Sequence, residues 1–188
     1  SENKVIDSDL SDDLNELLNE EDVDVKILCL TDVKEEEVEW LWFPYVAFGK
    51  VTLMHGNPGE GKTFASLKIA SQCTRGEALP GNVKLPPINI MYQTAEDGLG
   101  DTVKPRLRAT NADTDKVFTI DDGGKPITLT DPRLEKAIKQ VGAKLLIMDP
   151  IQAFVGAGVD INRANEVRAV LRPLCDMAQR NKCAVILI

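Results

Sequence analysis

The sequence contains few of the residues from which metal centres and disulfide frameworks are built. His55 is its only histidine, and the four cysteines form no Cys-x-x-Cys pair. Zinc sites need such ligands clustered at short spacings, so a zinc site is excluded and we expect His55 to serve in local packing. Cys73 and Cys183 lie in apolar stretches and are expected in the core. We therefore predict a chain without disulfides in a reducing, cytoplasmic compartment.

Long apolar runs are also missing. No run approaches the roughly 18 apolar residues that a membrane-spanning helix requires, and no signal peptide is visible. We therefore predict no membrane partner. The net charge of −8 does not argue against nucleic acid, because ten acidic residues and one basic residue lie within residues 1–24. The remaining chain holds 21 basic and 20 acidic residues, without a strongly basic patch.

Residues 1–24 are predicted to form an acidic tail, separate from a core of residues 25–188. Within the tail, Leu10, Leu14, Leu17 and Leu18 follow the spacing of one helical face. A short amphipathic helix is not stable alone. The tail therefore docks on its own domain, docks on a neighbouring copy, or stays disordered.

Strand patterns alternate with helical patterns along residues 25–188. Several strand patterns are apolar throughout, which indicates an α/β fold with a mostly parallel sheet and helices on both faces. Asp131, Pro132 and Gly142 are suited to cap the helix 132–141. The chain stops within its last apolar run, so we expect a C-terminally truncated domain. The predicted strands are 25–31, 51–55, 88–93, 117–120, 144–149 and 184–188, and the predicted helices begin near Lys62 and cover 100–109, 132–141 and 162–181.

Residues 56–63 read Gly-Asn-Pro-Gly-Glu-Gly-Lys-Thr and fit the P-loop pattern G-x-x-x-x-G-K-[ST]. Its glycines let backbone N–H groups point at phosphate oxygens, and the helix that follows favours an anion at its N-terminus. We expect Lys62 to reach the β- and γ-phosphates of ATP and the Thr63 hydroxyl to bind Mg²⁺. The predicted nucleotide-binding residues are Gly56, Asn57, Pro58, Gly59, Glu60, Gly61, Lys62, Thr63 and Phe64.

Two carboxylates complete the predicted site. Asp149 ends the apolar strand 144–149 and is the expected second ligand for Mg²⁺. Hydrolysis also needs a group that orients water, and the residue after Asp149 is Pro150, which cannot serve. We predict that Glu96 has this role, since it follows the strand 88–93 and open α/β sheets bind ligands at that edge. Asp97 is the alternative. Lys62 and Glu96 are thus the predicted catalytic residues.

Four of the nine aromatic residues cluster in the segment Trp40-Leu41-Trp42-Phe43-Pro44-Tyr45. One interpretation is that this segment packs beneath the sheet. The other is that one of its rings stacks on the adenine base.

These motifs together resemble the RecA-like ATPases of the RepA type, which are related to hexameric replicative helicases and are often described as AAA-family ATPases. The resemblance covers roughly residues 25–188. Beyond the P-loop, the matching segments are Trp40-Leu41-Trp42 with Pro44-Tyr45, Gly49-Lys50, Glu96-Asp97-Gly98, Asp101-Thr102 with Pro105-Arg106-Leu107, Ile147-Met148-Asp149-Pro150, Val167-Arg168 and Ala184-Val185-Ile186-Leu187.

The resemblance implies a RecA-like core in which strand 184–188 separates the Asp149 strand from the P-loop strand. It also implies Glu96 as the catalytic carboxylate, ATP bound between subunits of a homo-oligomeric ring (usually a hexamer), and single-stranded DNA in the channel. In such enzymes a His or Gln, often with a Lys, follows the last strand, which here ends the chain. The loop Phe154–Val159 is expected to face the channel, with Gly156, Gly158 and Arg163 as candidates for DNA contact and Arg163 near the phosphates.

Two other functions remain open on the residues alone. A small-molecule phosphotransferase would use Glu96 or Asp97 as the base for its acceptor. A nucleotide-dependent switch without hydrolysis would explain Pro150 and the early end of the chain. The helicase-like ATPase is the interpretation that accounts for most of the motifs.

Overall fold

The computed structural model describes residues 26–159 and 163–188, which include a compact unit at Val38–Ile188 and part of a separate N-terminal unit. In the N-terminal unit the described residues contain a short 3₁₀ helix, η1 (Leu30–Asp32). The predicted strand 25–31 is wrong for residues 26–31. Ile27 and Leu30 are exposed there and pair with no other strand in the described part of the chain. The leucines predicted to form a helix in the tail lie outside the described residues.

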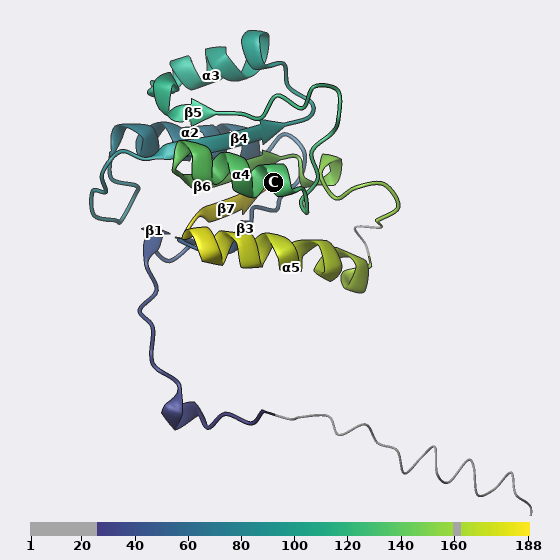
Figure 1. Ribbon diagram of the computed structural model, residues 1–188. Helices are drawn as coiled ribbons and strands as arrows, with labels where there is room; N and C mark the ends of the chain where they lie inside the picture. Colours follow the sequence, from purple (N-terminus) through teal and green to yellow (C-terminus); the bar gives the residue numbers. More distant parts are fainter. Residues whose placement is uncertain (1–25, 160–162) are drawn as a thin grey trace, which may run out of the picture. The chain divides into compact units, whose positions relative to one another are not determined.

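The compact unit is built on a parallel five-stranded sheet with the order β3-β7-β6-β4-β5 (Figure 1). This arrangement confirms the predicted α/β fold with a parallel sheet. It also confirms that strand β7 separates the P-loop strand, β3, from the strand that carries Asp149, β6. The strands are β3 (Val51–Leu53), β4 (Asn89–Thr94), β5 (Val117–Phe118), β6 (Ala143–Asp149) and β7 (Ala184–Leu187).

Helices cover both faces of this sheet, and β4, β6 and β7 therefore bury side chains on both sides. Helices α2 (Lys62–Arg75) and α3 (Lys104–Ala109) pack on one face, and α4 (Pro132–Val141) and α5 (Ala164–Asn181) pack on the other. Three short helices, η2 (Leu99–Val103, a π-helix), η3 (Thr114–Lys116) and η4 (Ile151–Ala153), lie in the connections. Among the described helices, none is long and apolar enough to cross a bilayer.

The predicted helix signals act where expected. The Asp131 side chain accepts a hydrogen bond from the Arg133 N–H, Pro132 is the first residue of α4, and Gly142 ends the helix with φ of 64°. Cys73 and Cys183 are buried, which confirms their predicted place in the core, and burial raises the pKa of both thiols to about 12. They therefore remain protonated at neutral pH.

The aromatic segment forms an antiparallel ribbon of β1 (Trp40–Trp42) and β2 (Val46–Ala47). Leu41 is buried in the core that α2 shares, and the Trp42 Nε1–H donates to the Pro80 carbonyl at 3.0 Å. Pro80 follows the end of α2 that is remote from the P-loop, and a helix of this length spans about 20 Å. The ribbon therefore packs against the scaffold, and the adenine-stacking interpretation finds no support in this chain.

Candidate active site

The glycine-rich loop joins β3 to α2 at the carboxyl edge of the sheet. Gly59 and Gly61 adopt φ values of 81° and 82°, which side chains with a Cβ rarely tolerate. Gly61 is the N-cap residue and α2 begins at Lys62, as predicted. The first N–H groups of a helix have no partner within the helix, and here they face the loop. The local geometry is therefore that of an anion-binding turn.

Glu60 closes the loop on itself. Its carboxylate accepts the backbone N–H of Asn57 at 2.7 Å and the Asn57 side-chain amide at 2.9 Å, and these bonds lower the pKa of Glu60. A Cβ on Gly56 would lie 2.5 Å from the Glu60 Oε2, so this position is restricted to glycine while the clasp is formed. Lys62 completes the arrangement, since its Nζ donates to the carbonyl oxygens of Gly56 and Asn57 at 2.8 and 2.7 Å.

Thr63 and Asp149 meet although 86 positions separate them in the sequence. The Thr63 hydroxyl donates to the Asp149 Oδ2 at 2.6 Å, and Asp149 is 8% exposed. Their oxygens are hard ligands of the kind that Mg²⁺ prefers, and Mg²⁺ usually takes one or two carboxylates together with substrate phosphates and waters. The described residues contain no cluster of three or more His, Cys, Asp or Glu that could hold a metal. The oxygens of Thr63 and Asp149 fit a Mg²⁺ that is shared with nucleotide phosphates.

Glu96 lies at the same edge of the sheet. Strand β4 pairs with β6 so that Thr94 is opposite Asp149, and Glu96 follows Thr94 by two residues. Glu96 is exposed, and within the described residues its carboxylate has no ion pair or hydrogen bond. Asp97 differs, because its Oδ2 accepts from Arg106 at 2.8 Å and is held by that pair. Of the two predicted bases, Glu96 is the one whose carboxylate is free to bind water.

Among the described residues, no hydrogen bond or ion pair links the remaining predicted site residues to Lys62, Asp149 or Glu96. Phe64 is 61% exposed on the first turn of α2. Gly156 and Gly158 have φ values of 92° and 86° in the loop after η4, and Arg163 forms a 3.2 Å ion pair with Glu166.

Two sequence expectations need correction. Phe154 was expected in a loop that faces a channel, but it is 3% exposed and packs in the core under α4 and α5. Its backbone carbonyl accepts the Leu129 N–H at 2.7 Å, which fixes this part of the chain. His55 was expected to pack locally, but it is exposed just before the P-loop. Val155 also packs partly against the core that holds Phe154, so the exposed residues of the described loop are Ala157 and Gly158.

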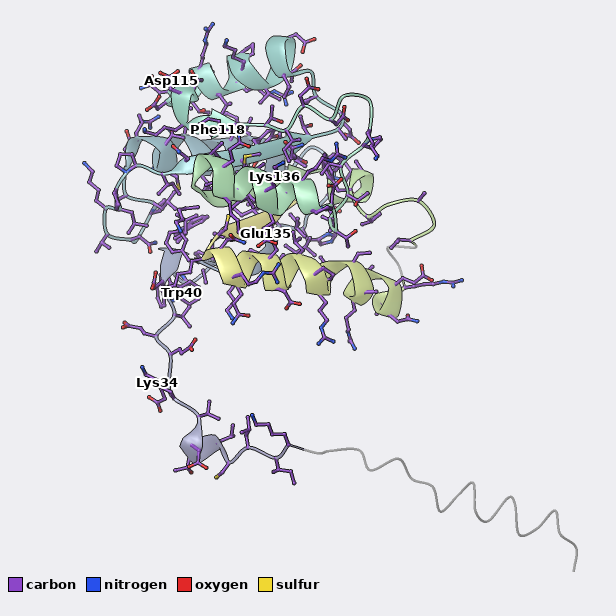
Figure 2. All side chains as sticks on the ribbon, viewed as in Figure 1. Lys34, Trp40, Asp115, Phe118, Glu135 and Lys136 are labelled. Carbon is purple, nitrogen blue, oxygen red and sulfur yellow. The ribbon has the colours of Figure 1, made fainter. Side chains whose placement is uncertain are left out.

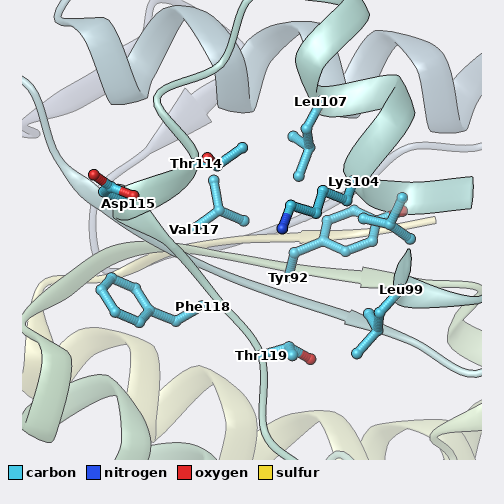
Figure 3. Close-up of a pocket in the computed structure, with 10 residues that line it drawn as sticks. Tyr92, Leu99, Lys104, Leu107, Thr114, Asp115, Val117, Phe118 and Thr119 are labelled. Atoms are coloured by element: carbon cyan, nitrogen blue, oxygen red, sulfur yellow. The ribbon is translucent and has the colours of Figure 1, made fainter. Parts of the chain in front are cut away.

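Tyr92 was not singled out from the sequence, although it lies on β4 two residues before Thr94, which is paired with Asp149. Its ring forms one wall of a mostly apolar cavity of about 280 Å³ between α3 and β5, into which the Lys104 side chain reaches (Figure 3). The sequence did hold a signal for its place in the site. Tyr92 precedes Thr94 by two residues, and alternate residues of a strand share a face. The other lining residues are Leu99, Val103, Leu107, Thr114, Asp115, Val117, Phe118 and Thr119.

A parallel α/β sheet, a glycine loop leading into a helix, and a threonine in contact with a strand-end aspartate together define a P-loop NTPase with a RecA-like fold. Comparison with protein families agrees: the family described as "AAA domain" (AAA_25) matches residues 15–188. The chain belongs to this family of P-loop ATPases.

The fold is also similar to a solved structure, that of a KaiC-like protein from the hyperthermophilic archaeon Pyrococcus horikoshii OT3. The match has a TM-score of 0.50 and 18% sequence identity, and it covers 76% of this chain and 65% of that one. At this identity the likeness concerns the fold alone, and the chain spans about two thirds of the length of its structural relative. No curated protein matches the sequence.

Proposed function

We propose that this chain is the ATP-hydrolysing motor domain of an oligomeric protein that acts on DNA, of the replicative helicase type. The observation that carries the ATPase part is the 2.6 Å contact between Thr63 and Asp149. It joins the start of α2 to the end of β6 at the edge where parallel α/β sheets bind their ligands. A chance glycine-rich turn would not bring a strand-end carboxylate to the hydroxyl beside the P-loop lysine.

Each residue then has a defined task. The backbone of the glycine loop binds the phosphates, and Lys62 leaves its contacts with loop carbonyls to pair with the β- and γ-phosphate oxygens. Thr63 and Asp149 would hold Mg²⁺, which would supply positive charge beside the phosphates. Glu96 orients the attacking water, a task that its exposed and unpaired carboxylate suits.

The DNA part of the proposal rests on the family resemblance and on the loop after β6. Gly156 and Gly158 give this loop a backbone that few other residues could adopt, and they follow the metal-binding strand by a few residues. A segment in that place is able to respond to the state of the γ-phosphate. We assign Gly156, Gly158 and Arg163 as DNA-contacting candidates on these grounds.

The test is ATP turnover with and without single-stranded DNA, at low salt, since phosphate contacts weaken steeply as salt rises. We expect turnover that DNA stimulates. Lys62→Ala is the matched control, and we expect it to weaken triphosphate binding and abolish turnover. No stimulation together with no DNA affinity would refute the DNA part. ATP binding without any turnover would favour a nucleotide switch instead.

Ring formation is tested through the tail. If Leu10, Leu14, Leu17 and Leu18 dock on a neighbouring copy, deletion of residues 1–20 should lower the average mass measured by light scattering. A matched control replaces the acidic residues of the tail with amides and keeps the leucines. An unchanged mass after the deletion would show that the tail does not hold the oligomer together.

A further inference from the structure

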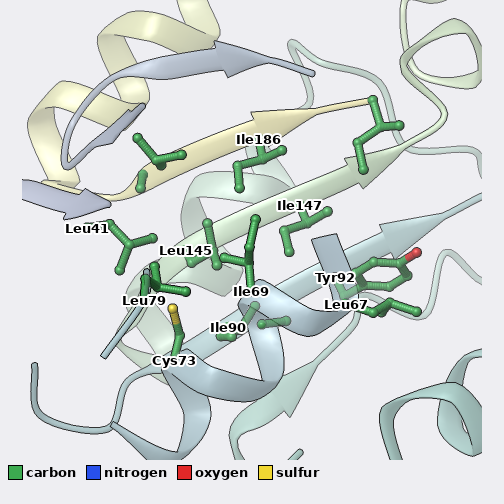
Figure 4. Packing of buried hydrophobic residues seen from close by; sticks show 14 of the residues in the cluster. Leu41, Leu67, Ile69, Cys73, Leu79, Ile90, Tyr92, Leu145, Ile147 and Ile186 are labelled. Atoms are coloured by element: carbon green, nitrogen blue, oxygen red, sulfur yellow. The ribbon is translucent and has the colours of Figure 1, made fainter. Parts of the chain in front are cut away.

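Tyr92 occupies a defined position relative to the proposed Mg²⁺ ligand. Alternate residues of a strand share a face, so Ile90, Tyr92 and Thr94 point toward α2, as do their partners Leu145, Ile147 and Asp149 on β6. On this face of the sheet, the pair Tyr92 and Ile147 therefore immediately precedes the pair Thr94 and Asp149. Figure 4 shows its ring beside Leu67, with the hydroxyl on the side away from Ile90, which is the direction of the carboxyl edge.

The Tyr92 hydroxyl is buried without a partner. The residue is 1% exposed, and Oη has no hydrogen-bond partner in the part of the chain that the structure describes. Buried hydroxyl groups are nearly always paired, because leaving one unpaired forfeits the hydration it had in the unfolded chain. A group of this kind beside a candidate ligand site therefore calls for a function, and phenylalanine would have filled the same space.

The charges around this hydroxyl identify what it can bind. Burial is the main cause that raises the pKa of Tyr92, and the negative charges of Asp149 and Asp97 add to it, while Arg106 opposes them. The Asp149 side chain adds a further hydrogen-bonding contribution, although Oη and the carboxylate do not meet hydrogen-bond geometry. A phenol is an O–H donor at neutral pH even at its ordinary pKa, so it can donate toward carboxylates. Arg106 already holds Asp97 through a 2.8 Å ion pair, which leaves Asp149 as the acceptor.

We propose that Tyr92 is a positioning residue that donates its phenolic hydrogen bond to the Asp149 carboxylate when Mg²⁺ and nucleotide are bound. This inference rests on the proposed function. Thr63 already donates to one oxygen of Asp149, Oδ2. A second donor on the carboxylate fixes its orientation, and hydrogen bonds to ligating carboxylates are a common way to tune metal affinity.

The experiment measures the affinity of the chain for a fluorescent, slowly hydrolysed ATP analogue, with Mg²⁺ and with EDTA. The readout is the ratio of the two dissociation constants, which needs no turnover. For Tyr92→Phe we expect the affinity in EDTA to be unchanged and the Mg²⁺-dependent gain to fall about 10-fold, the lower end of the range for residues that support a metal ligand. Raising the Mg²⁺ concentration should restore the lost affinity.

The control is Tyr45→Phe, since Tyr45 is the only other tyrosine and its exposed ring lies on the β1–β2 ribbon. It should keep the wild-type ratio. A wild-type ratio in Tyr92→Phe would overturn the assignment of Tyr92 and leave the proposed ATPase intact. A wild-type chain whose binding does not depend on Mg²⁺ would instead overturn the proposed function, so the two failures are distinguishable. Thermal melting confirms that both variants are folded.

Discussion

Asp149 ends β6 and Glu96 follows the neighbouring strand β4 by two residues, yet the surroundings of the two carboxylates differ. Asp149 is 8% exposed and accepts a hydrogen bond from the Thr63 hydroxyl at 2.6 Å, whereas Glu96 is exposed and its carboxylate has no partner among the described residues. The first carboxylate is held in place by the P-loop helix. The second follows β4 in a bend, where only the Thr94 hydroxyl contacts its backbone N–H, at 3.4 Å.

The difference separates binding from chemistry. A buried, hydrogen-bonded carboxylate has one orientation, which suits a metal ligand that must match a demanding octahedral geometry. An exposed carboxylate in a bend can approach a water molecule when the site closes, and catalytic contacts often tighten only in the complex with substrate. If this division is right, substitutions at the two positions will have different kinetic effects.

Of the two carboxylates, Glu96 should have the larger effect on turnover when it is replaced with Gln. The amide keeps the size of the side chain but cannot orient and activate water as a carboxylate does. We expect nucleotide binding to be retained and turnover to fall by about 10²-fold or more, the range for removal of a general base. Steady-state ATPase kinetics and a separate binding titration would measure the two quantities.

The adjacent acid provides the control. Asp97→Asn alters a carboxylate that already pairs with Arg106 at 2.8 Å, so turnover should change far less than in Glu96→Gln. Normal turnover in Glu96→Gln combined with a large loss in Asp97→Asn would reverse the assignment of the base.

Much of the carboxyl edge of the sheet could be predicted from the sequence, because the motifs that form it are local in the chain. The P-loop spacing specified the turn and the start of α2 at Lys62, and an apolar run ending in an acid specified β6 and Asp149. Asp131 and Gly142 delimited α4 in the same way. The position of β7 between the P-loop strand and β6 came from the resemblance, since parallel strands of similar composition do not themselves reveal which of them are neighbours.

The rest depended on packing between distant segments. Residues 26–31 have the composition of a strand but find no strand to pair with in the described chain. Phe154 is buried because the chain after β6 turns back over the core of α4 and α5, which its sequence neighbours do not indicate. The buried hydroxyl of Tyr92 and the clasp between Glu60 and Asn57 likewise arise only when the folded chain brings their partners together.

Asp149→Asn should produce a smaller and different change. Asparagine keeps an oxygen that can accept from Thr63 but loses the negative charge that attracts Mg²⁺. We expect the Mg²⁺ concentration for half-maximal nucleotide binding to rise at least about 10-fold, with little change in binding measured in EDTA. A Mg²⁺ dependence equal to that of the wild type would show that Asp149 is a structural partner of Thr63 and no more.

A third carboxylate, Glu135, shows what a purely structural acid looks like in this molecule. It lies on α4, on the side toward α5 (Figure 2), where it accepts from Arg180 at 2.9 Å and from Asn181 at 3.1 Å and pairs with Lys139 at 2.9 Å. The hydrogen bond from Arg180 is the largest cause that lowers the pKa of Glu135, from 4.5 to about 2. Its carboxylate therefore joins α4 to α5 and takes no part in the cluster of Thr63 and Asp149.

Glu135→Gln should leave turnover unchanged and lower the melting temperature slightly at neutral pH, by at most about a few degrees, because exposed ion pairs contribute little. A carboxyl whose pKa is lower in the folded state stabilises the protein above the pKa it has when unfolded. That contribution fades as the pH falls from about 4.5 toward 2, so the melting temperatures of variant and wild type should converge there. Glu36→Gln, at an exposed position without an ion pair in the described chain, is the control and should match the wild type at every pH.

A difference in melting temperature between Glu135→Gln and the wild type that persists below pH 2 would mean that the Glu135 side chain acts through packing. The contrast of Glu135 with Asp149 and Glu96 would then concern shape as well as charge.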